Sequence, residues 1–279
     1  MSRTAVFLDV DGTLIDDYGR VPDSAVQAVR EARENGHLVF LCTGRSMTEL
    51  TGDVLDVGYD GYVLASGAYV QVGSDVLRHE TLAPEALRHV ADYFGAHGGG
   101  YYFQAHHGVF ASPAARDLLR QVVASSIAAD PAFDEVDHGL LRYVETIVVD
   151  ADPFAEPVTK TIFFDAAATI EEIRAEFTDF EVVPASVTVF GTNAGEMMLP
   201  GVHKATGIEV VLAHLGIDRA DTIAIGDSYN DLEMLQHVAV GIAMGDAPQP
   251  VKDIADEVTA STTEDGVRLA FLRHGLIAA

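Results

Sequence analysis

Acidic side chains in this sequence gather at two places, each directly after a short apolar run. Asp9 and Asp11 follow one run near the N-terminus, and Asp227 and Asp231 follow another near the C-terminus. Paired carboxylates can divide nucleophilic attack and proton transfer between them, or can hold a hard divalent cation through oxygen atoms. A simple turn is the alternative, because Asp is common where a strand ends. Two such clusters favour the chemical interpretation, since crowded carboxylates repel one another unless a cation offsets the repulsion.

Two further segments carry groups suited to an anion. Thr43, Gly44 and Arg45 stand at the expected start of a helix, where a hydroxyl and backbone N–H groups favour a negative charge. Ordinary N-capping by Thr43 or Ser46 is the alternative. Lys204 also stands at a helix start, where the helix dipole disfavours a cation. The chain has three lysines (the others are Lys160 and Lys252), so this placement favours a fixed charge for phosphate, with a solvated surface lysine as the alternative.

These groups need a scaffold that brings distant segments together. Five short apolar runs are typical of buried parallel strands: residues 5–8, 38–41, 62–65, 222–225 and 240–244. Helical patterns between them, such as residues 24–35 and 203–215, predict βαβ units and one parallel sheet. Ligands bind outside the carboxyl ends of such strands. We therefore expect both acidic clusters and the Thr43 segment to meet at one edge of the sheet.

The middle of the chain has a different pattern. Helical stretches alternate irregularly with strand-like runs, and glycine and proline punctuate both. The expected helices cover residues 84–97 and 113–128, and the expected strands cover residues 101–104, 146–149, 161–164 and 187–190. This composition predicts an α+β domain inserted into the α/β domain. The expected boundaries give residues 1–78 and 191–279 to the core and residues 79–190 to the insertion.

Composition excludes several classes of function. The 279 residues include 17 basic and 43 acidic side chains, a formal net charge of −26. Such a chain lacks the basic stripe that binds nucleic acid, and anionic membranes repel it. One cysteine, Cys42, permits no internal disulfide and no cysteine-based zinc cluster. No run of 18 apolar residues predicts a membrane span, so we expect a cytoplasmic protein and predict no particular oligomeric state.

The order and spacing of the four clusters are similar to the motifs of the haloacid dehalogenase-like superfamily of phosphatases. Asp9-Val10-Asp11-Gly12-Thr13 resembles its first motif, Thr43 its second, Lys204 its third, and Gly226-Asp227 with Asn230-Asp231 its fourth. The insertion resembles a C2-type cap. Residues 200–204, Ala247 and Glu264-Asp265-Gly266 are similar to the Cof-type sugar-phosphatase subgroup. The resemblance implies a Rossmann-like parallel sheet core with an inserted α+β cap.

Two positions depart from the subgroup pattern. Ser66-Gly67 stands where an Asn-Gly pair is usual, so that a hydroxyl replaces an amide that could contact substrate. Lys204-Ala205 stands where Lys-Gly is usual. Neither change removes a catalytic group, although the first weakens any inference about the substrate from the subgroup.

The resemblance implies a role for each cluster. Asp9 would attack the phosphorus, and Asp11, starting protonated, would protonate the leaving alcohol and then deprotonate the attacking water. A carboxylate oxygen of Asp9, the backbone carbonyl of Asp11 and the carboxylate of Asp227 would hold Mg²⁺. The groups expected to bind phosphate are Thr43, Gly44, Arg45, Lys204 and Asn230, and Arg45 could instead reach a sugar. Asp231 would orient Lys204 or a metal-bound water.

The predicted function is a Mg²⁺-dependent phosphatase acting on small phosphorylated metabolites, either sugar phosphates or a phosphorylated cofactor. Two alternatives remain open at this point. A phosphotransferase or mutase would pass the phosphoryl group from Asp9 to a sugar hydroxyl. A phosphate-sensing protein would retain the scaffold without catalysis, although every reactive group is present in the sequence.

Overall fold

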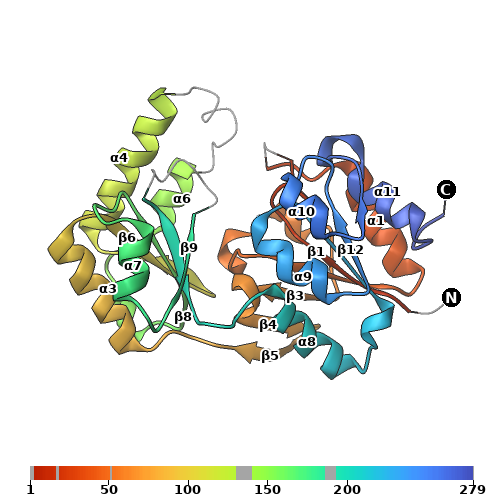
Figure 1. The fold of residues 1–279 in the computed structure, drawn as a ribbon, viewed down its shortest axis with the longest axis horizontal. Coiled ribbons are helices and arrows are strands. Elements are labelled where there is room, and N and C mark those ends of the chain that lie inside the picture. Colours follow the sequence, from red (N-terminus) through yellow and green to blue (C-terminus); the bar gives the residue numbers. More distant parts are fainter. Residues whose placement is uncertain (1–2, 17–18, 51, 130–139, 186–192, 279) are drawn as a thin grey trace. The chain divides into compact units, whose positions relative to one another are not determined.

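Two separate sheets organise the chain (Figure 1). The computed structural model describes residues 3–16, 19–50, 52–129, 140–185 and 193–278. It divides into two compact units. The core unit comprises Met1–Arg45, Glu49–His79 and Val202–Ala279, and the inserted unit comprises Ser46–Thr48 and Glu80–Gly201.

The described part of the core unit contains an eight-stranded sheet in the order β13-β12-β11-β1-β2-β3-β4-β5. Neighbouring strands from β13 to β3 are parallel, whereas β4 and β5 are added in antiparallel pairings. The strand bounds are β1 Ala5–Leu8, β2 Leu38–Cys42, β3 Gly61–Leu64, β4 Tyr69–Val72, β5 Asp75–His79, β11 Thr222–Gly226, β12 Val240–Ala243 and β13 Glu257–Val258.

The central strands form because their apolar runs are buried on both faces of the sheet. In the register, Leu8 of β1 lies beside Leu41 of β2 and Ile225 of β11. Since all three strands run in the same direction, their carboxyl ends meet at one edge. The chain leaves this edge through the segments that begin at Asp9, Thr43 and Asp227, as the sequence predicts.

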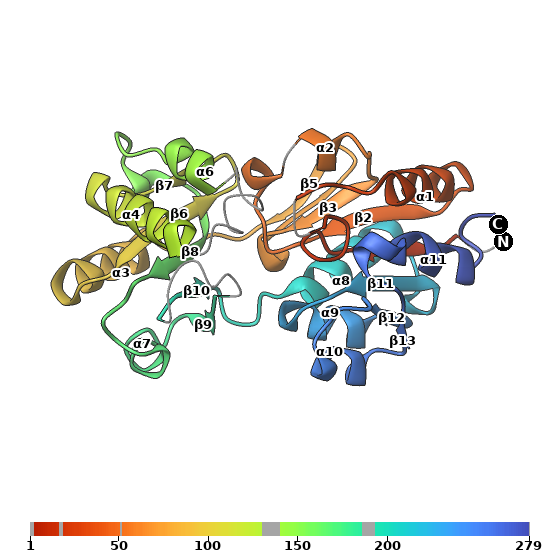
Figure 2. The same cartoon turned by 90° about the horizontal axis from the view of Figure 1, so that it is seen from above.

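Helices cover both faces of this sheet (Figure 2). Side chains of α8, α9 and α10 pack with Phe7 and Phe40 on one face, and α1 packs against β2 and α11 on the other. Helix α8 ends at Gly216, which has φ 64°. The helix bounds are α1 Asp23–Glu34, α2 Gly52–Leu55, α8 Lys204–Leu215, α9 Leu232–His237, α10 Gln249–Ile254 and α11 Gly266–Arg273.

The described part of the inserted unit contains an antiparallel sheet in the order β7-β6-β8-β10-β9. Its strands are β6 Gly100–Ala105, β7 Gly108–Phe110, β8 Val158–Phe164, β9 Glu181–Pro184 and β10 Gly195–Met198. Its helices are α3 Pro84–His97, α4 Pro113–Ala129, α6 Leu140–Thr146 and α7 Ile170–Glu176. α3 and α7 contribute to one apolar cluster, and α4 and α6 contribute to another. The predicted fold class, a parallel α/β core with a separate α+β unit, is confirmed.

Two details of the sequence interpretation differ from the structure, and a third is not tested by it. The inserted unit continues to Gly201 rather than to residue 190, because β10 pairs with β8 and β9. The strand expected at residues 146–149 is instead the end of α6 followed by an isolated bridge between Val148 and Phe110. The strand expected at residues 187–190 lies outside the described residues.

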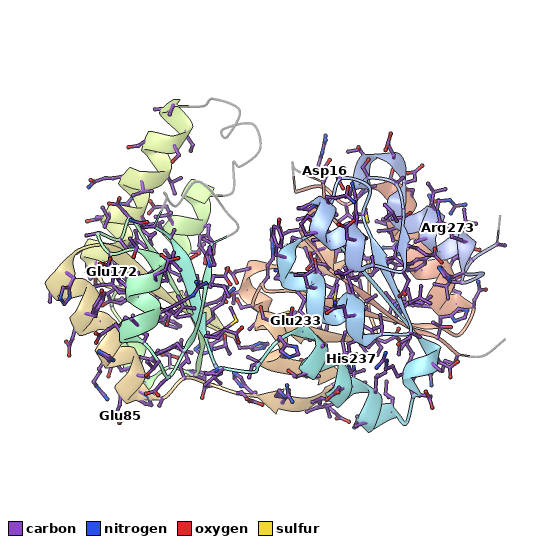
Figure 3. The ribbon with its side chains drawn as sticks, viewed as in Figure 1. Asp16, Glu85, Glu172, Glu233, His237 and Arg273 are labelled. Carbon is purple, nitrogen blue, oxygen red and sulfur yellow. The ribbon has the colours of Figure 1, made fainter. Side chains whose placement is uncertain are left out.

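Much of the acidic charge lies on helix faces that solvent reaches. Glu85 on α3, Glu172 on α7 and Glu233 on α9 are exposed examples (Figure 3). Among the described residues, no helix combines the length and the apolar character that crossing a membrane requires. Asp9 and Asp231, at the carboxyl edge of the core sheet, differ from this surface charge because they are buried.

Candidate active site

A buried lysine joins the two acidic clusters. Lys204, the first residue of α8, donates from Nζ to Asp9 Oδ1 and to Asp231 Oδ1, with both distances 2.6 Å. Its side chain has no solvent exposure. Burial alone would lower the pKa of Lys204, but the carboxylates of Asp231 and Asp9 raise the pKa above its ordinary value. The lysine is therefore a permanent positive charge at the centre of the site.

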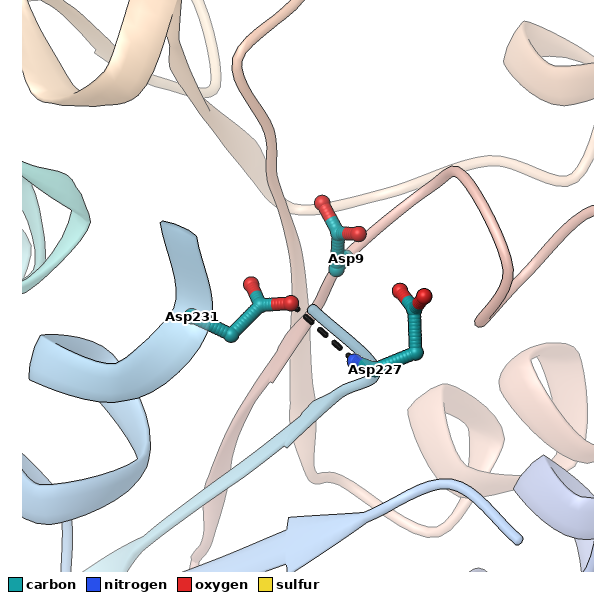
Figure 4. Close-up of side chains that lie close together, drawn as sticks. All are labelled: Asp9, Asp227 and Asp231. Carbon is teal, nitrogen blue, oxygen red and sulfur yellow. Dashed lines mark hydrogen bonds between the residues drawn. The ribbon is translucent and has the colours of Figure 1, made fainter. Parts of the chain in front are cut away.

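Asp231 uses both carboxylate oxygens within the protein. Oδ1 accepts from Lys204, and Oδ2 accepts from the backbone N–H groups of Asp227 and Ser228, each at 3.0 Å (Figure 4). The side chain is fully buried. Asp231 thus fixes Lys204 and shapes the loop that follows β11. Of the two predicted roles, the orientation of Lys204 is the one that its contacts support.

Residues of the loop that follows β1 contact the carboxylate of Asp227. Thr13 donates from Oγ1 to Asp227 Oδ1 at 3.4 Å. Gly12, which has φ 70°, approaches the same carboxylate so closely that a Cβ atom would lie 2.5 Å from Oδ2. Asp9 continues the pairing of β1 with β11 through its N–H, which donates to Ile225 O at 3.0 Å. Backbone contacts therefore set the spacing between Asp9 and Asp227.

Three carboxylates converge here with one lysine. Asp9, Asp227 and Asp231 each offer an oxygen within 4.8 Å of the others (Figure 4). Burial and the neighbouring Asp231 raise the pKa of Asp9, and the same two causes raise the pKa of Asp227 to about 7. One lysine leaves this negative charge incompletely offset. A hard divalent cation fits these oxygen donors, and because both oxygens of Asp231 already accept hydrogen bonds, Asp9 and Asp227 are the candidate side-chain ligands.

The side chain of Asp11 does not join this cluster. Arg45 donates from Nε to Asp11 Oδ2 at 2.9 Å and from Nη2 to Asp11 Oδ1, and its Nη1 donates to Glu49 O at 2.9 Å. The Asp11 side chain is 57% exposed and that of Arg45 is 30% exposed. The sequence predicts that Arg45 contacts the phosphate or the sugar of a substrate. In this structure, its guanidinium forms a bidentate ion pair with Asp11, the predicted general acid.

The other residues predicted to bind phosphate lie along the same carboxyl edge of the core sheet. Thr43 is buried after β2, and its Oγ1 accepts from the N–H of Arg45 at 3.2 Å, across the intervening Gly44. Asn230 accepts from Lys204 Nζ at 3.4 Å and from Ser228 Oγ at 2.8 Å through the same oxygen. The strand register places Thr43 beside the Asp9 segment. Every predicted site residue is therefore on this edge, with Asp11 turned toward Arg45.

Two supporting segments escaped the sequence interpretation. Thr262 is buried and donates from Oγ1 to Gly12 O at 2.7 Å, although 250 positions separate them. The turn Ala65–Gly67 after β3 binds the Thr43 segment through backbone groups. The Glu264-Asp265-Gly266 motif near Thr262 and the Ser66-Gly67 pair were visible signals, but neither showed which backbone atoms it would hold.

One edge of the parallel core sheet thus carries a buried lysine between two carboxylates, and three carboxylate oxygens close enough together to hold a cation. The chain belongs to the family of haloacid dehalogenase-like hydrolases, which matches residues 6–271. The predicted family and the prediction of an enzyme are confirmed.

Known proteins resemble this chain over nearly its full length. A structure from Geobacillus kaustophilus has a TM-score of 0.83 and 27% identity, and covers 99% of this chain and 100% of its own. The sugar phosphatase BT4131, of haloacid dehalogenase subclass IIB, has a TM-score of 0.75 and 26% identity, with coverages of 98% and 100%. The 5-amino-6-(5-phospho-D-ribitylamino)uracil phosphatase YitU of Bacillus subtilis is 24% identical, with 94% of each chain covered.

Proposed function

We propose that this protein is a Mg²⁺-dependent phosphatase that hydrolyses small phosphate monoesters through a phosphorylated Asp9. The observation that carries the proposal is Lys204 held 2.6 Å from both Asp9 and Asp231, with Asp227 beside them. This arrangement provides a carboxylate nucleophile next to a fixed positive charge. In the same proposal, the core unit performs the chemistry and the inserted unit acts as a cap that selects the substrate.

The first step forms a bond between Asp9 and phosphorus. One oxygen of Asp9 attacks in line, the bond from phosphorus to the ester oxygen breaks, and the leaving alkoxide takes a proton from Asp11. Lys204 and Thr43 hold the oxygens of the transferring group, and Asn230 helps to position them. Phosphoryl transfer requires alignment and charge stabilisation above all, and these side chains provide both.

The second step releases phosphate. A water attacks the phosphorus of the aspartyl-phosphate, Asp11 takes a proton from that water, and the bond between Asp9 and phosphorus breaks. In its pair with Arg45, Asp11 accepts hydrogen bonds at both oxygens, so at least one oxygen must be freed from Arg45 before Asp11 takes the proton of the water. The first step instead requires Asp11 to carry a proton, so Asp11 must leave Arg45 before it acts as the acid.

The metal belongs to the same proposal. Asp9 and Asp227 would hold Mg²⁺ through their carboxylates, together with the backbone carbonyl of Asp11. When bound, Mg²⁺ offsets the repulsion between the Asp9 carboxylate and a phosphate dianion. The carboxylate cluster, whose charge Lys204 offsets only in part, supports this assignment.

We infer that the substrate carries a polyhydroxylated group. BT4131 is named a sugar phosphatase, and YitU is named for a phosphorylated ribityl compound. Both names describe a phosphate ester of a sugar or a sugar alcohol. A small cytoplasmic metabolite of this class, including a phosphorylated cofactor precursor, is the expected substrate of this chain.

Phosphate release tests the proposal directly. Purified protein with Mg²⁺ is assayed against a panel of sugar phosphates, sugar-alcohol phosphates and other phosphorylated metabolites. We expect Mg²⁺-dependent release of inorganic phosphate, and a loss of at least about 10³-fold in Asp9→Asn, which keeps the shape of the side chain but not its nucleophilic charge. Full activity in Asp9→Asn would refute the nucleophile.

The same assay separates the alternatives. A mutase would convert a sugar phosphate into its isomer, with little release of phosphate into water. A phosphate-sensing protein would bind an oxyanion and turn over none of the panel. Chromatography of the sugar phosphates after incubation distinguishes these results from hydrolysis.

A further inference from the structure

The turn that follows β3 has an unusual backbone. Ala65 and Ser66 have φ values of 48° and 56°, and Gly67 has φ 100°. Within the described residues, two other non-glycine positions, Asp165 and Asp265, have positive φ. Side chains rarely adopt this left-handed conformation, and it persists where surrounding contacts impose it. Two such residues in succession, Ala65 and Ser66, both buried, indicate that this turn is held under strain.

One side of the turn holds the segment with the predicted phosphate-binding hydroxyl. The N–H of Ala65 donates to Arg45 O at 2.9 Å, and the N–H of Ser66 donates to Thr43 O at 3.0 Å. The left-handed φ of Ala65 directs the N–H of Ser66 to Thr43 O, and the left-handed φ of Ser66 then directs the chain onward to Gly67. The turn thereby fixes the backbone on both sides of Gly44.

The other side of the turn holds the start of α8. A Cβ atom on Gly67 would lie 2.4 Å from His203 O, and one on Gly207 would lie 3.1 Å from Gly67 Cα. Arg78 adds a link by donating from Nη1 to Thr206 Oγ1 at 3.2 Å and to Gly67 O at 3.4 Å. Lys204 lies within this first helical turn. One small turn therefore contacts both elements that carry the predicted phosphate-binding groups.

We propose that the Ala65–Gly67 turn is a positioning element that sets the separation of Thr43 from Lys204 through its strained backbone. Ser66 and Gly67 are its positioning residues, and Ser66 acts through its N–H and its φ rather than through its hydroxyl. The proposal deepens the proposed function, because the two groups it spaces are the ones that hold the phosphoryl oxygens. A shift of about 1 Å in such a pair is enough to cost about a hundredfold in rate.

Substitutions at Ser66 separate the backbone from the side chain. A β-branched valine is strongly disfavoured at φ 56°, whereas glycine adopts that conformation freely and asparagine tolerates it. We expect Ser66→Val to weaken the binding of tungstate, a phosphate-shaped oxyanion, at least about tenfold in calorimetry with Mg²⁺ present. Its kcat should fall by a similar factor. Ser66→Gly and Ser66→Asn should bind within about threefold of the wild type.

A matched control applies the same strain away from the site. Asp165 of the inserted unit has φ 48° and is exposed, so Asp165→Val should leave tungstate affinity unchanged. Circular dichroism and thermal midpoints establish that each variant is folded. Ser66→Thr, a milder β-branched change, should show a smaller loss of the same kind and replaces Ser66→Val if that chain does not fold.

The outcomes are distinct. Loss in Ser66→Val with retention in Ser66→Gly supports the proposal. Equal losses of tungstate affinity in Ser66→Gly and Ser66→Val would assign the effect to the hydroxyl. Unchanged tungstate affinity in Ser66→Val would show that the turn does not position the phosphate-binding groups. Either result overturns the inference. Wild-type protein that binds no tungstate with Mg²⁺ would overturn the proposed function itself, before any variant is compared.

Discussion

Replacing Lys204 by methionine should show how much the charge of this lysine stabilises the buried carboxylates around it. The substitution keeps an unbranched chain of similar length in helix α8 and removes the charge that lies 2.6 Å from both Asp9 Oδ1 and Asp231 Oδ1. Both carboxylates stay buried, since their side chains are 4% and 0% exposed. Removing one partner of a buried ion pair costs about 3–5 kcal/mol. We expect a loss of this size in the free energy of unfolding of metal-free protein at pH 8.

The loss should depend on pH, and its sign follows from the carboxylates. Burial already raises the pKa of Asp9, and the absence of Lys204 raises it further. An acid whose pKa is higher in the folded state than the unfolded value of about 3.9 binds the extra proton while folded, so stability falls as pH rises. Between about pH 4 and the raised pKa, each extra bound proton contributes a slope of about 1.4 kcal/mol per pH unit. The variant should therefore approach the wild type in stability as pH falls toward 5.

Urea unfolding in EDTA at pH 5, 6, 7 and 8, together with phosphate release with Mg²⁺, measures both effects. The double variant Lys204→Met/Asp231→Asn removes one stranded carboxylate and should recover at least about half of the lost stability, while phosphatase activity stays at least about 10³-fold below that of the wild type. Lys160→Met is a matched control for stability. Lys160 is also buried, but its carboxylate partner Glu196 is 25% exposed, so the loss should be smaller and less dependent on pH.

Two results would contradict this reasoning. Lys204→Met that unfolds at the wild-type urea concentration at pH 8 would show that the lysine does not offset buried charge. A double variant no more stable than the single variant would show that Asp231 is not the stranded group.

Further predictions concern the metal and the loops that position it. Burial and Asp231 raise the pKa of Asp227 to about 7, so metal-free protein should lose stability as pH rises from 5 to 8. Mg²⁺ should then raise the thermal midpoint more at pH 8 than at pH 6. Equal shifts of the midpoint at the two pH values would argue against Asp227 as a ligand. Gly12→Ala places a Cβ atom 2.5 Å from Asp227 Oδ2 and should raise the Mg²⁺ concentration for half-maximal activity at least about tenfold, whereas Gly19→Ala, at a similar φ with open space around it, should not. Thr262→Val removes the 2.7 Å hydrogen bond to Gly12 O, so it should lower the free energy of unfolding in urea by about 1–2 kcal/mol and should also lower kcat. Thr263→Val, at an exposed position, should change neither quantity. Unchanged kinetics in Thr262→Val would show that Gly12 does not need this hydrogen bond.

The central strands of the core sheet were predictable because a strand buried on both faces requires a continuous run of apolar residues. The runs at β1 and β2 are apolar throughout, β11 is mostly apolar and fully buried, and the order of helices and strands around them admits few alternatives. The hairpin of β4 and β5 was not predicted. β5 is largely exposed and shows no apolar alternation, since it forms by pairing with β4 rather than by covering a core.

The identities of the site residues were predictable, but several of their contacts were not. Charged side chains at strand ends indicated Asp9 and Asp227, because the topology of a parallel sheet brings such ends together, and a lysine at a helix start indicated Lys204. The pairing of Arg45 with Asp11 depends on side-chain directions in two loops, which no periodicity encodes. The bond from Thr262 to Gly12 likewise joins segments 250 positions apart and arises only once the fold exists.

Several features of this chain that oppose folding lie at the carboxyl edge of the core sheet. Asp9 and Asp231 are carboxyl groups buried beside a third carboxylate, and Ala65 and Ser66 occupy a backbone region that side chains avoid. Protein chains keep such features where function requires them, because each lowers stability by itself. The two kinds of feature should respond differently to substitution. Neutralising Asp231 alone would leave the buried charge of Lys204 with one of its two carboxylate partners, so it should lower stability and catalysis together. Ser66→Gly should instead make the metal-free fold easier to maintain without a loss of catalysis, because it keeps the backbone while removing the strain.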